Sequence, residues 1–144
     1  MLIELKVKNF RSFREEAVFS MVASADKALL ENTVPVPEFG NRSLLRSAVI
    51  YGSNAAGKTN LIAAVGFMGH LVNTSMDKKL DEPIDVKPFV LTAAPNLAPS
   101  EFEITFLDDD GVRYQYGFHV TSKRVVREWL IAYPKGLPQT WFER

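Results

Sequence analysis

The stretch Gly52-Ser53-Asn54-Ala55-Ala56-Gly57-Lys58-Thr59 fits the pattern G-x-x-x-x-G-K-[ST], the phosphate-binding P-loop. A short apolar run, Ala48-Val49-Ile50-Tyr51, precedes it, and the residues from Leu61 to Val72 follow it with apolar side chains at helical spacing. This order predicts a buried parallel strand, then a glycine-rich loop, then a helix. That is the setting in which a P-loop works.

The chemistry of this stretch follows from its residue types. Gly52 and Gly57 allow the backbone to fold back, so that N–H groups converge on an oxyanion at the positive end of the following helix. Lys58 is expected to reach the β- and γ-phosphates of ATP, and the Thr59 hydroxyl to bind the accompanying Mg²⁺ ion. The alternative is an ordinary glycine-containing turn with Lys58 in solvent. We interpret the stretch as a nucleoside triphosphate site.

Composition sets the outer bounds. The chain has 144 residues, of which 47% are hydrophobic and 24% charged, as in an ordinary globular domain. The net charge is zero, so composition gives no argument for binding nucleic acid or a membrane. There is no cysteine, which excludes a disulfide framework and a thiolate metal site. The N-terminus does not read as a signal peptide, and we expect a cytoplasmic protein.

Most of the remaining sequence has the alternating pattern of half-buried strands. The turn Asn9-Phe10-Arg11-Ser12-Phe13 ends the first alternation, and Asp108-Asp109-Asp110-Gly111 is a strong hairpin signal. The predicted strands are residues 3–7, 17–23, 48–51, 102–106, 112–120, 125–133 and 140–143.

These elements predict an α/β fold. We expect the N-terminal lobe of a P-loop NTPase (strand, P-loop, helix) with an appended antiparallel β-meander. Residues 1–144 form a single ATP-binding lobe. Within it, residues 1–76 are the P-loop core, 24–46 an insertion, 77–88 a charged connection and 88–144 the antiparallel part.

The helix after Lys58 is apolar on nearly all sides, so we expect other parts of the protein to cover most of it. Gly66 and Gly69 lie within it, although each costs about 1 kcal/mol relative to alanine inside a helix. Their presence predicts close packing of the helix against the sheet.

Other groups that could carry chemistry are interpreted as structural. The run from Ile104 to Asp109 superficially resembles a Walker B strand, but its alternation and the following Asp-Gly favour an antiparallel hairpin. His70 and His119 lack clustered acids at ligand spacing, so a histidine metal site is not expected. The aromatic strand face is expected in the core rather than as a base-stacking platform. A basic cluster, Lys123, Arg124 and Arg127, is expected on a solvated strand edge.

Two of these motifs together resemble a known family. The turn Asn9-Phe10-Arg11-Ser12-Phe13 after a first strand, followed by the residues from Gly52 to Leu61, is similar to the ABC-type ATPase heads of RecF, the coiled-coil repair ATPases and the structural-maintenance-of-chromosomes proteins. The nearest resemblance is to bacterial AAA-family ATPases related to the OLD (overcoming lysogenization defect) proteins, several of which serve in anti-phage defence. It includes the segment from Val126 to Gly136 and spans nearly the whole chain.

The resemblance implies roles for further residues. Arg11 matches the arginine that approaches the bound phosphates in the repair ATPases, with a solvated turn arginine as the alternative. Asn54 and Asn60 are typical of the family's loop and are expected to shape and cap it. Ala55 and Ala56 replace the commoner glycine-containing form, which the loop tolerates if both keep a negative φ. The implied nucleotide-binding residues are Arg11, Gly52, Ser53, Asn54, Ala55, Ala56, Gly57, Lys58, Thr59 and Asn60, with Thr59 also the Mg²⁺ ligand.

The resemblance also implies what a complete ATPase head contains. Hydrolysis in these families uses a Q-loop glutamine, an L-S-x-G signature segment, a Walker B Asp-Glu and a switch histidine, all of which follow the antiparallel part. Neither Gln115 nor Gln139 can be placed as the Q-loop residue. We therefore expect a lobe that is incomplete without a C-terminal ATPase lobe or a second head, as in a homodimer of heads, with nucleic acid as a further candidate partner. Hydrolysis of ATP is expected of the full assembly and not of this chain alone.

Two other functional classes stay open. A small P-loop kinase or GTPase is one, although the chain has no guanine-reading N-K-x-D segment and a β-meander is a poor substitute for a kinase lid. The other is a non-catalytic interaction module that keeps the fold and binds a partner. Exposed apolar surface would favour that module.

Overall fold

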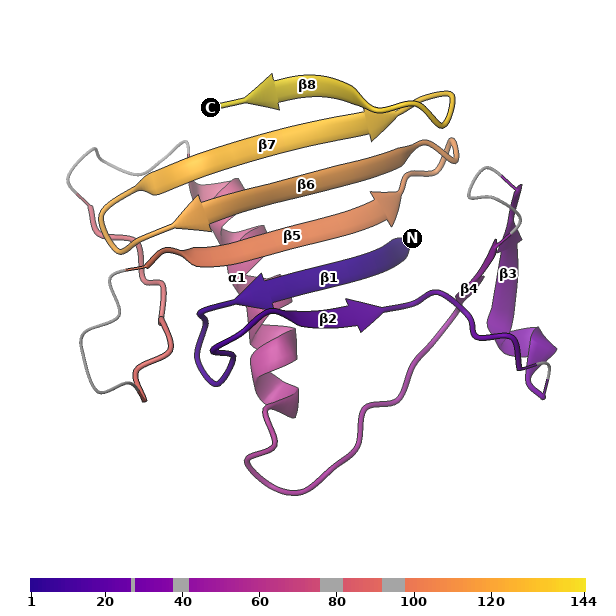
Figure 1. The fold of residues 1–144 in the computed structure, drawn as a ribbon, viewed down its shortest axis with the longest axis horizontal. Helices are drawn as coiled ribbons and strands as arrows, with labels where there is room; N and C mark the ends of the chain where they lie inside the picture. Colours follow the sequence, from indigo (N-terminus) through magenta and orange to yellow (C-terminus); the bar gives the residue numbers. More distant parts are fainter. Residues whose placement is uncertain (27, 38–41, 76–81, 92–97) are drawn as a thin grey trace.

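The computed structural model of the chain describes residues 1–26, 28–37, 42–75, 82–91 and 98–144. They contain a six-stranded sheet with the strand order β2-β1-β5-β6-β7-β8, in which every neighbouring pair is antiparallel (Figure 1). Its strands are β1 (Leu2–Lys8), β2 (Ala17–Ser20), β5 (Ser100–Leu107), β6 (Arg113–Val120), β7 (Val125–Tyr133) and β8 (Gln139–Glu143).

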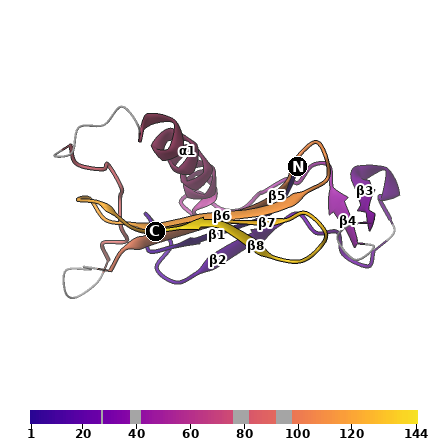
Figure 2. The same ribbon diagram turned by 90° about the horizontal axis from the view of Figure 1, so that it is seen from above.

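The other elements are a second, two-stranded sheet and the helices. The short sheet consists of β3 (Thr33–Val36) and β4 (Arg42–Leu45), and a 3-10 turn, η1 (Leu30–Asn32), precedes it. The helix α1 (Lys58–Thr74) lies on one face of the large sheet, and the β3–β4 hairpin lies beyond one end of it (Figure 2).

The N-terminal strand and the C-terminal meander form one sheet. Strand β1 pairs with β5 in a register that sets Lys6 opposite Glu103 and Lys8 opposite Glu101. Both pairs form ion pairs, with Nζ–Oε1 distances of 3.0 and 3.1 Å. The alternation of charged and apolar residues explains this, because one face of β1 and β5 carries the charges while the other enters the core. The predicted meander is therefore not an appendage but continues the sheet that β1 begins.

The main core lies between the sheet and α1. Ala64, Met68 and Leu71 form the buried side of the helix. They pack in one cluster with buried residues of β1, β5 and β6. Four phenylalanines link the layers, with ring centroids 5.1 to 6.3 Å apart; they are Phe10, Phe67, Phe102 and Phe118. Aromatic pairs at such distances contribute about 0.5–1.5 kcal/mol each beyond burial.

The predicted insertion over residues 24–46 contains the β3–β4 hairpin. Val36 and Leu44 of the hairpin pack in a smaller core cluster with Ile3 and Leu107 of the large sheet. Residues 27 and 38–41 of the insertion, and residues 77–81 of the predicted charged connection, lie outside the described residues.

The predicted hairpin at Asp108 is confirmed. The Asp108 carboxylate accepts a hydrogen bond from the backbone N–H of Val112 at 2.8 Å, and Gly111 has a φ of 78°. The carboxylate thus stabilises the β5–β6 turn. The other strand predictions also hold, with ends shifted by a few residues, apart from the strand before the P-loop.

The predicted buried strand over residues 48–51 is wrong for the described chain. These residues form no strand and lie at the surface, where Val49 is 83% and Tyr51 89% exposed. A strand needs a neighbour that supplies backbone hydrogen bonds and apolar cover. In the described residues, the strands that could do so pair elsewhere.

The expectation that α1 is covered on most sides is also wrong for the described residues. Ile62, Val65 and Val72 are exposed on it. A Cβ added to Gly66 or Gly69 would meet nothing within 4 Å, so these glycines do not serve close packing against the sheet.

No helix in the described ranges is long and apolar enough to cross a membrane.

Candidate nucleotide-binding site

The P-loop forms an exposed turn that leads directly into α1. Ala55 and Gly57 both have left-handed backbone conformations, with φ of 63° and 91°. The helix begins at Lys58, and the Asn60 N–H bonds to the carbonyl of Gly57 at 2.9 Å. N–H groups at the very start of a helix lack intrahelical acceptors, and together with the helix dipole they favour an anion there. The loop therefore meets the backbone requirement for binding phosphate.

Lys58 lies across this loop. Its ammonium group donates hydrogen bonds to the carbonyl oxygens of Gly52 and Ser53 at 2.8 and 2.7 Å. The positive charge is thus held at the loop rather than extended into solvent. Phosphate oxygens are stronger acceptors than carbonyls, so they can take over these donors.

Thr59 is the residue of the site that fits Mg²⁺. It follows Lys58 in the first turn of α1 and is exposed. Mg²⁺ prefers oxygen ligands, retains several waters and is commonly held with the help of substrate phosphates. One hydroxyl beside a phosphate-binding loop suits that pattern. Among the described residues, no group of three or more His, Cys, Asp or Glu side chains could hold a metal on its own.

The turn over residues 9–13 lies against the P-loop. The Asn60 side chain accepts a hydrogen bond from Arg11 Nη1 at 3.4 Å and donates one from its amide nitrogen to Ser12 Oγ at 2.8 Å. A Cβ on Gly57 would lie 3.1 Å from the same Ser12 oxygen. The structure therefore brings Arg11 and the P-loop together, although they are more than forty residues apart in sequence.

This turn is held in an unusual conformation by its anchors. Asn9 and Arg11 have φ of 51° and 50°, a region that costs non-glycine residues about 1–2 kcal/mol each. The buried Asn9 amide bonds to the carbonyls of Ala98 and Pro99, and the Arg11 N–H bonds to the carbonyl of Lys87 at 2.7 Å. Such anchoring fixes the backbone from which the exposed Arg11 side chain projects.

Ser12 was not among the predicted site residues, and Asn60 was expected to shape and cap the loop. The N-terminal cap of α1 is Gly57, which has no side-chain cap, while Asn60 bonds to the neighbouring turn. The signal for Ser12 was its place beside Arg11 in a turn that the resemblance had already singled out. Its small hydroxyl suits a contact with a glycine.

Ala55 departs from the condition set by sequence analysis, because its φ is positive rather than negative. The conformation is strained for alanine and unstrained for glycine. We predict that Ala55→Gly raises the free energy of unfolding by about 1 kcal/mol, since relief of strain outweighs the greater flexibility of the unfolded chain. Thermal unfolding should show a melting temperature about 3 °C higher.

The neighbouring residue supplies the control for Ala55. Ala56 does not have a positive φ, so Ala56→Gly should lower stability slightly. A higher melting temperature for Ala56→Gly than for Ala55→Gly would contradict the left-handed conformation of Ala55.

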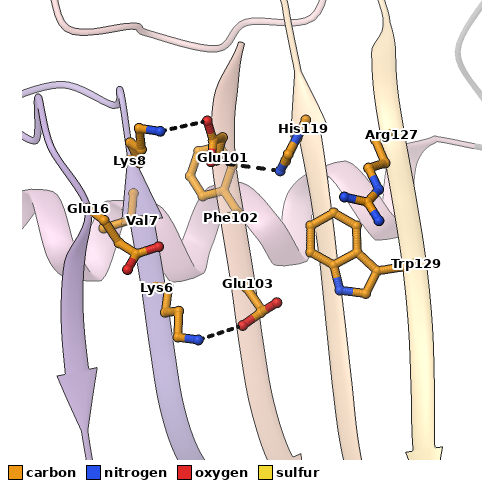
Figure 3. A pocket seen from close by; sticks show the side chains of 10 residues that line it. All are labelled: Lys6, Val7, Lys8, Glu16, Glu101, Phe102, Glu103, His119, Arg127 and Trp129. Atoms are coloured by element: carbon orange, nitrogen blue, oxygen red, sulfur yellow. Dashed lines mark hydrogen bonds and ion pairs between the residues drawn. The ribbon is translucent and has the colours of Figure 1, made fainter.

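The opposite face of the sheet carries a shallow polar hollow of about 240 Å³ (Figure 3). Its charged residues are matched across the strands, and burial lowers the pKa of His119. The basic cluster Lys123, Arg124 and Arg127 is exposed, as expected, and Arg127 forms an ion pair with Glu143 of β8 at 2.6 Å. Since cations and carboxylates alternate, the hollow offers no preference for an anionic or a cationic ligand. Its lining is Lys6, Val7, Lys8, Glu16, Glu101, Phe102, Glu103, His119, Arg127 and Trp129.

An exposed P-loop at the start of a helix defines the class of the protein, a P-loop ATPase-type domain. Comparison with protein families agrees. The family described as "AAA domain, putative AbiEii toxin, Type IV TA system" matches residues 47–144, which include the P-loop, α1 and the strands β5 to β8. The chain belongs to this family of AAA domains. No curated protein and no solved structure matches it.

Proposed function

We propose that the chain is the ATP–Mg²⁺-binding lobe of an ABC-type ATPase head of the kind found in OLD-like, RecF-like and structural-maintenance-of-chromosomes proteins. The family match supports ATP binding in general terms. The observation that carries the finer proposal is the contact between Arg11 and Asn60 at 3.4 Å. It brings an arginine on a rigid turn beside the first turn of the P-loop helix, where a γ-phosphate would carry its charge.

The proposed roles of the site residues follow from their chemistry. Backbone N–H groups from Gly52 to Lys58 surround the phosphates, the Lys58 ammonium exchanges its carbonyl partners for β- and γ-oxygens, and Thr59 holds Mg²⁺. Arg11 adds a second cation beside the γ-phosphate. ADP has no γ-phosphate and cannot interact with this charge. This arrangement favours the triphosphate.

We also propose that a C-terminal ATPase lobe covers the exposed apolar surface. The segment 48–51 has the composition of a buried strand, and the outer side of α1 exposes Ile62, Val65 and Val72. Parallel strands of such a lobe would pair with 48–51 and pack on α1, and burial of apolar surface contributes about 25 cal/mol per Å². Gly66 and Gly69, which have open space above them, would let that layer approach closely.

The machine to which this lobe belongs is proposed to act on nucleic acid or in anti-phage defence, with two heads closing over the nucleotide as a homodimer. This rests on the resemblance of the Arg11 turn and the P-loop to those ATPases. The exposed apolar surface is also what a non-catalytic interaction module would present. Saturable ATP binding separates the two, because such a module has no need of it.

We predict that Arg11→Ala weakens ATP binding by about tenfold or more and ADP binding much less. A hydrogen bond to a charged group contributes about 1.5–3 kcal/mol, and the added charge of ATP is at the γ-phosphate. Titration of the variant with fluorescent analogues of both nucleotides in the presence of Mg²⁺ gives the ratio of the two dissociation constants.

A neighbouring arginine provides the control for Arg11. Arg14 is exposed, follows in the same connection and forms an ion pair with Glu15 at 3.4 Å. Arg14→Ala should leave the ratio of the ATP and ADP dissociation constants at the wild-type value. An Arg11→Ala variant with the same ratio as Arg14→Ala would remove Arg11 from the site.

A further inference from the structure

Asn60 joins two parts of the site. It is the third residue of α1, and its side chain is turned towards the turn over residues 9–13. The amide oxygen accepts from Arg11 Nη1 and the amide nitrogen donates to Ser12 Oγ. The two polar atoms of the Asn60 amide thus contact two different residues of the turn. An apolar residue could make neither bond.

The Asn60 bridge, formed by its hydrogen bonds to Arg11 and Ser12, links two parts of the chain that are held differently, the turn over residues 9–13 and the P-loop. The turn is anchored by the buried Asn9, whose amide bonds to the carbonyls of Ala98 and Pro99 just before β5, and by the bond from the Arg11 N–H to Lys87. The P-loop, by contrast, is an exposed turn, and Gly57, its last residue before α1, lies next to Ser12. Asn60 therefore adds a polar link between the anchored turn and the start of the helix, beside the packing of Phe10 on Phe67.

The bridge also restrains the Arg11 side chain. Arginine is long and flexible, and ordering an exposed one on binding a ligand is entropically unfavourable. The hydrogen bond to Asn60 uses one of the five guanidinium donors and leaves the others for phosphate oxygens. A restrained guanidinium is already ordered before the nucleotide arrives.

We propose that Asn60 is a positioning residue that holds the Arg11 guanidinium at the γ-phosphate end of the P-loop and thereby sets the preference for ATP over ADP. The inference rests on the proposed function, because it requires ATP at this loop. It assigns Asn60 no direct contact with the reacting atoms. Asn60 acts through Arg11.

The test measures dissociation constants for ATP and ADP, with Mg²⁺, in wild type, Asn60→Ala, Arg11→Ala and the double variant. Asn60→Ala should reduce the ratio of ADP to ATP dissociation constants by about three- to tenfold, the effect of one or two hydrogen bonds. In the Arg11→Ala background, Asn60→Ala should cause no further change in this ratio. Ser12→Ala, which removes one arm of the bridge, should give a smaller reduction.

A matched control lies on the same helix. Asn73 is exposed in the last turn of α1, far along the chain from the P-loop, and Asn73→Ala should leave the ratio unchanged. Melting temperatures measured beside the affinities identify any variant that is merely unfolded. If Asn60→Ala melts much earlier than wild type, Asn60→Ser and Ser12→Ala carry the same comparison.

The outcomes are distinct. An unchanged ratio in a folded Asn60 variant, an equal loss for both nucleotides, or an effect that adds in full to that of Arg11→Ala would overturn the positioning role while leaving the nucleotide site intact. Wild-type protein that binds neither nucleotide would instead overturn the proposed function, and this inference with it.

Discussion

Replacing Lys58 by alanine should weaken binding of ATP–Mg²⁺ about ten- to hundredfold while leaving the chain folded. The ammonium group is held at the loop by two carbonyls, at 2.8 and 2.7 Å, and a phosphate would take these donors. Hydrogen bonds to charged groups contribute about 1.5–3 kcal/mol, which converts to that loss of affinity. Titration with a fluorescent ATP analogue measures it.

Lys123 is the matched control for Lys58. It is exposed in the turn between β6 and β7, on the part of the chain remote in sequence from the P-loop. Lys123→Ala removes the same charge from the protein and should retain wild-type affinity. Equal affinities for Lys58→Ala and Lys123→Ala would exclude Lys58 from the site.

Replacing Gly117 by alanine should lower the free energy of unfolding by about 1–3 kcal/mol, the usual effect of overpacking. Gly117 lies in β6 directly opposite Trp129 of β7. A Cβ there would stand 2.2 Å from Cζ2 and 2.6 Å from Cε2 of the Trp129 ring, and 2.9 Å from the carbonyl oxygen of Phe102. The indole can lie flat over β6 only because the strand has a glycine at this point. Thermal and urea unfolding measure the change.

Two controls accompany Gly117→Ala. In a Trp129→Ala background the ring is gone, so the part of the cost of Gly117→Ala that comes from the ring should vanish, while the contact with the Phe102 carbonyl remains. Gly66→Ala, by contrast, places a methyl group in open space on a helix and should raise stability by about 1 kcal/mol. A Gly117→Ala variant as stable as wild type would mean that Trp129 does not cover this glycine.

Local patterns in the sequence were sufficient to predict the sheet. Strands β5 and β6 alternate apolar and polar residues, and an Asp-Gly turn joins them. These signals involve residues only a few positions apart, so they do not depend on the tertiary structure. What they could not reveal was the pairing of β1 with β5, which joins residues about a hundred positions apart. Alternation tells which face of a strand is buried, not which strand lies beside it.

The wrong predictions concern two elements, the strand over residues 48–51 and the fully buried helix α1, that would need other parts of a protein to pack over them. Val49 and Ile50 read as a buried strand and α1 reads as a buried helix, yet both expose apolar side chains. Hydrophobicity indicates that a residue would gain from burial, and the described residues provide that burial on one side of α1 and leave Val49 exposed. We attribute the remaining signal to the proposed C-terminal lobe.

The individual motifs of the site could be predicted from the sequence, but the contacts that connect them could not. The P-loop and Arg11 could be identified, the first by motif and the second by resemblance. The Asn60 bridge could not, because its two partners are 48 and 49 residues away and the amide of asparagine fits many roles. Nor could the left-handed Ala55, since alanine gives no sign of a positive φ.

One measurement on the purified chain tests the central claim most directly. ATP–Mg²⁺ binding and phosphate release are followed together in wild type and in Lys58→Ala. We expect saturable ATP binding that Lys58→Ala weakens about ten- to hundredfold. Phosphate release should stay at the level of the buffer, because Lys58, Thr59 and Mg²⁺ supply only the phosphate side of the reaction and Asp108 is engaged in a turn. A folded wild-type chain that shows no saturable binding of ATP at millimolar concentration would contradict it.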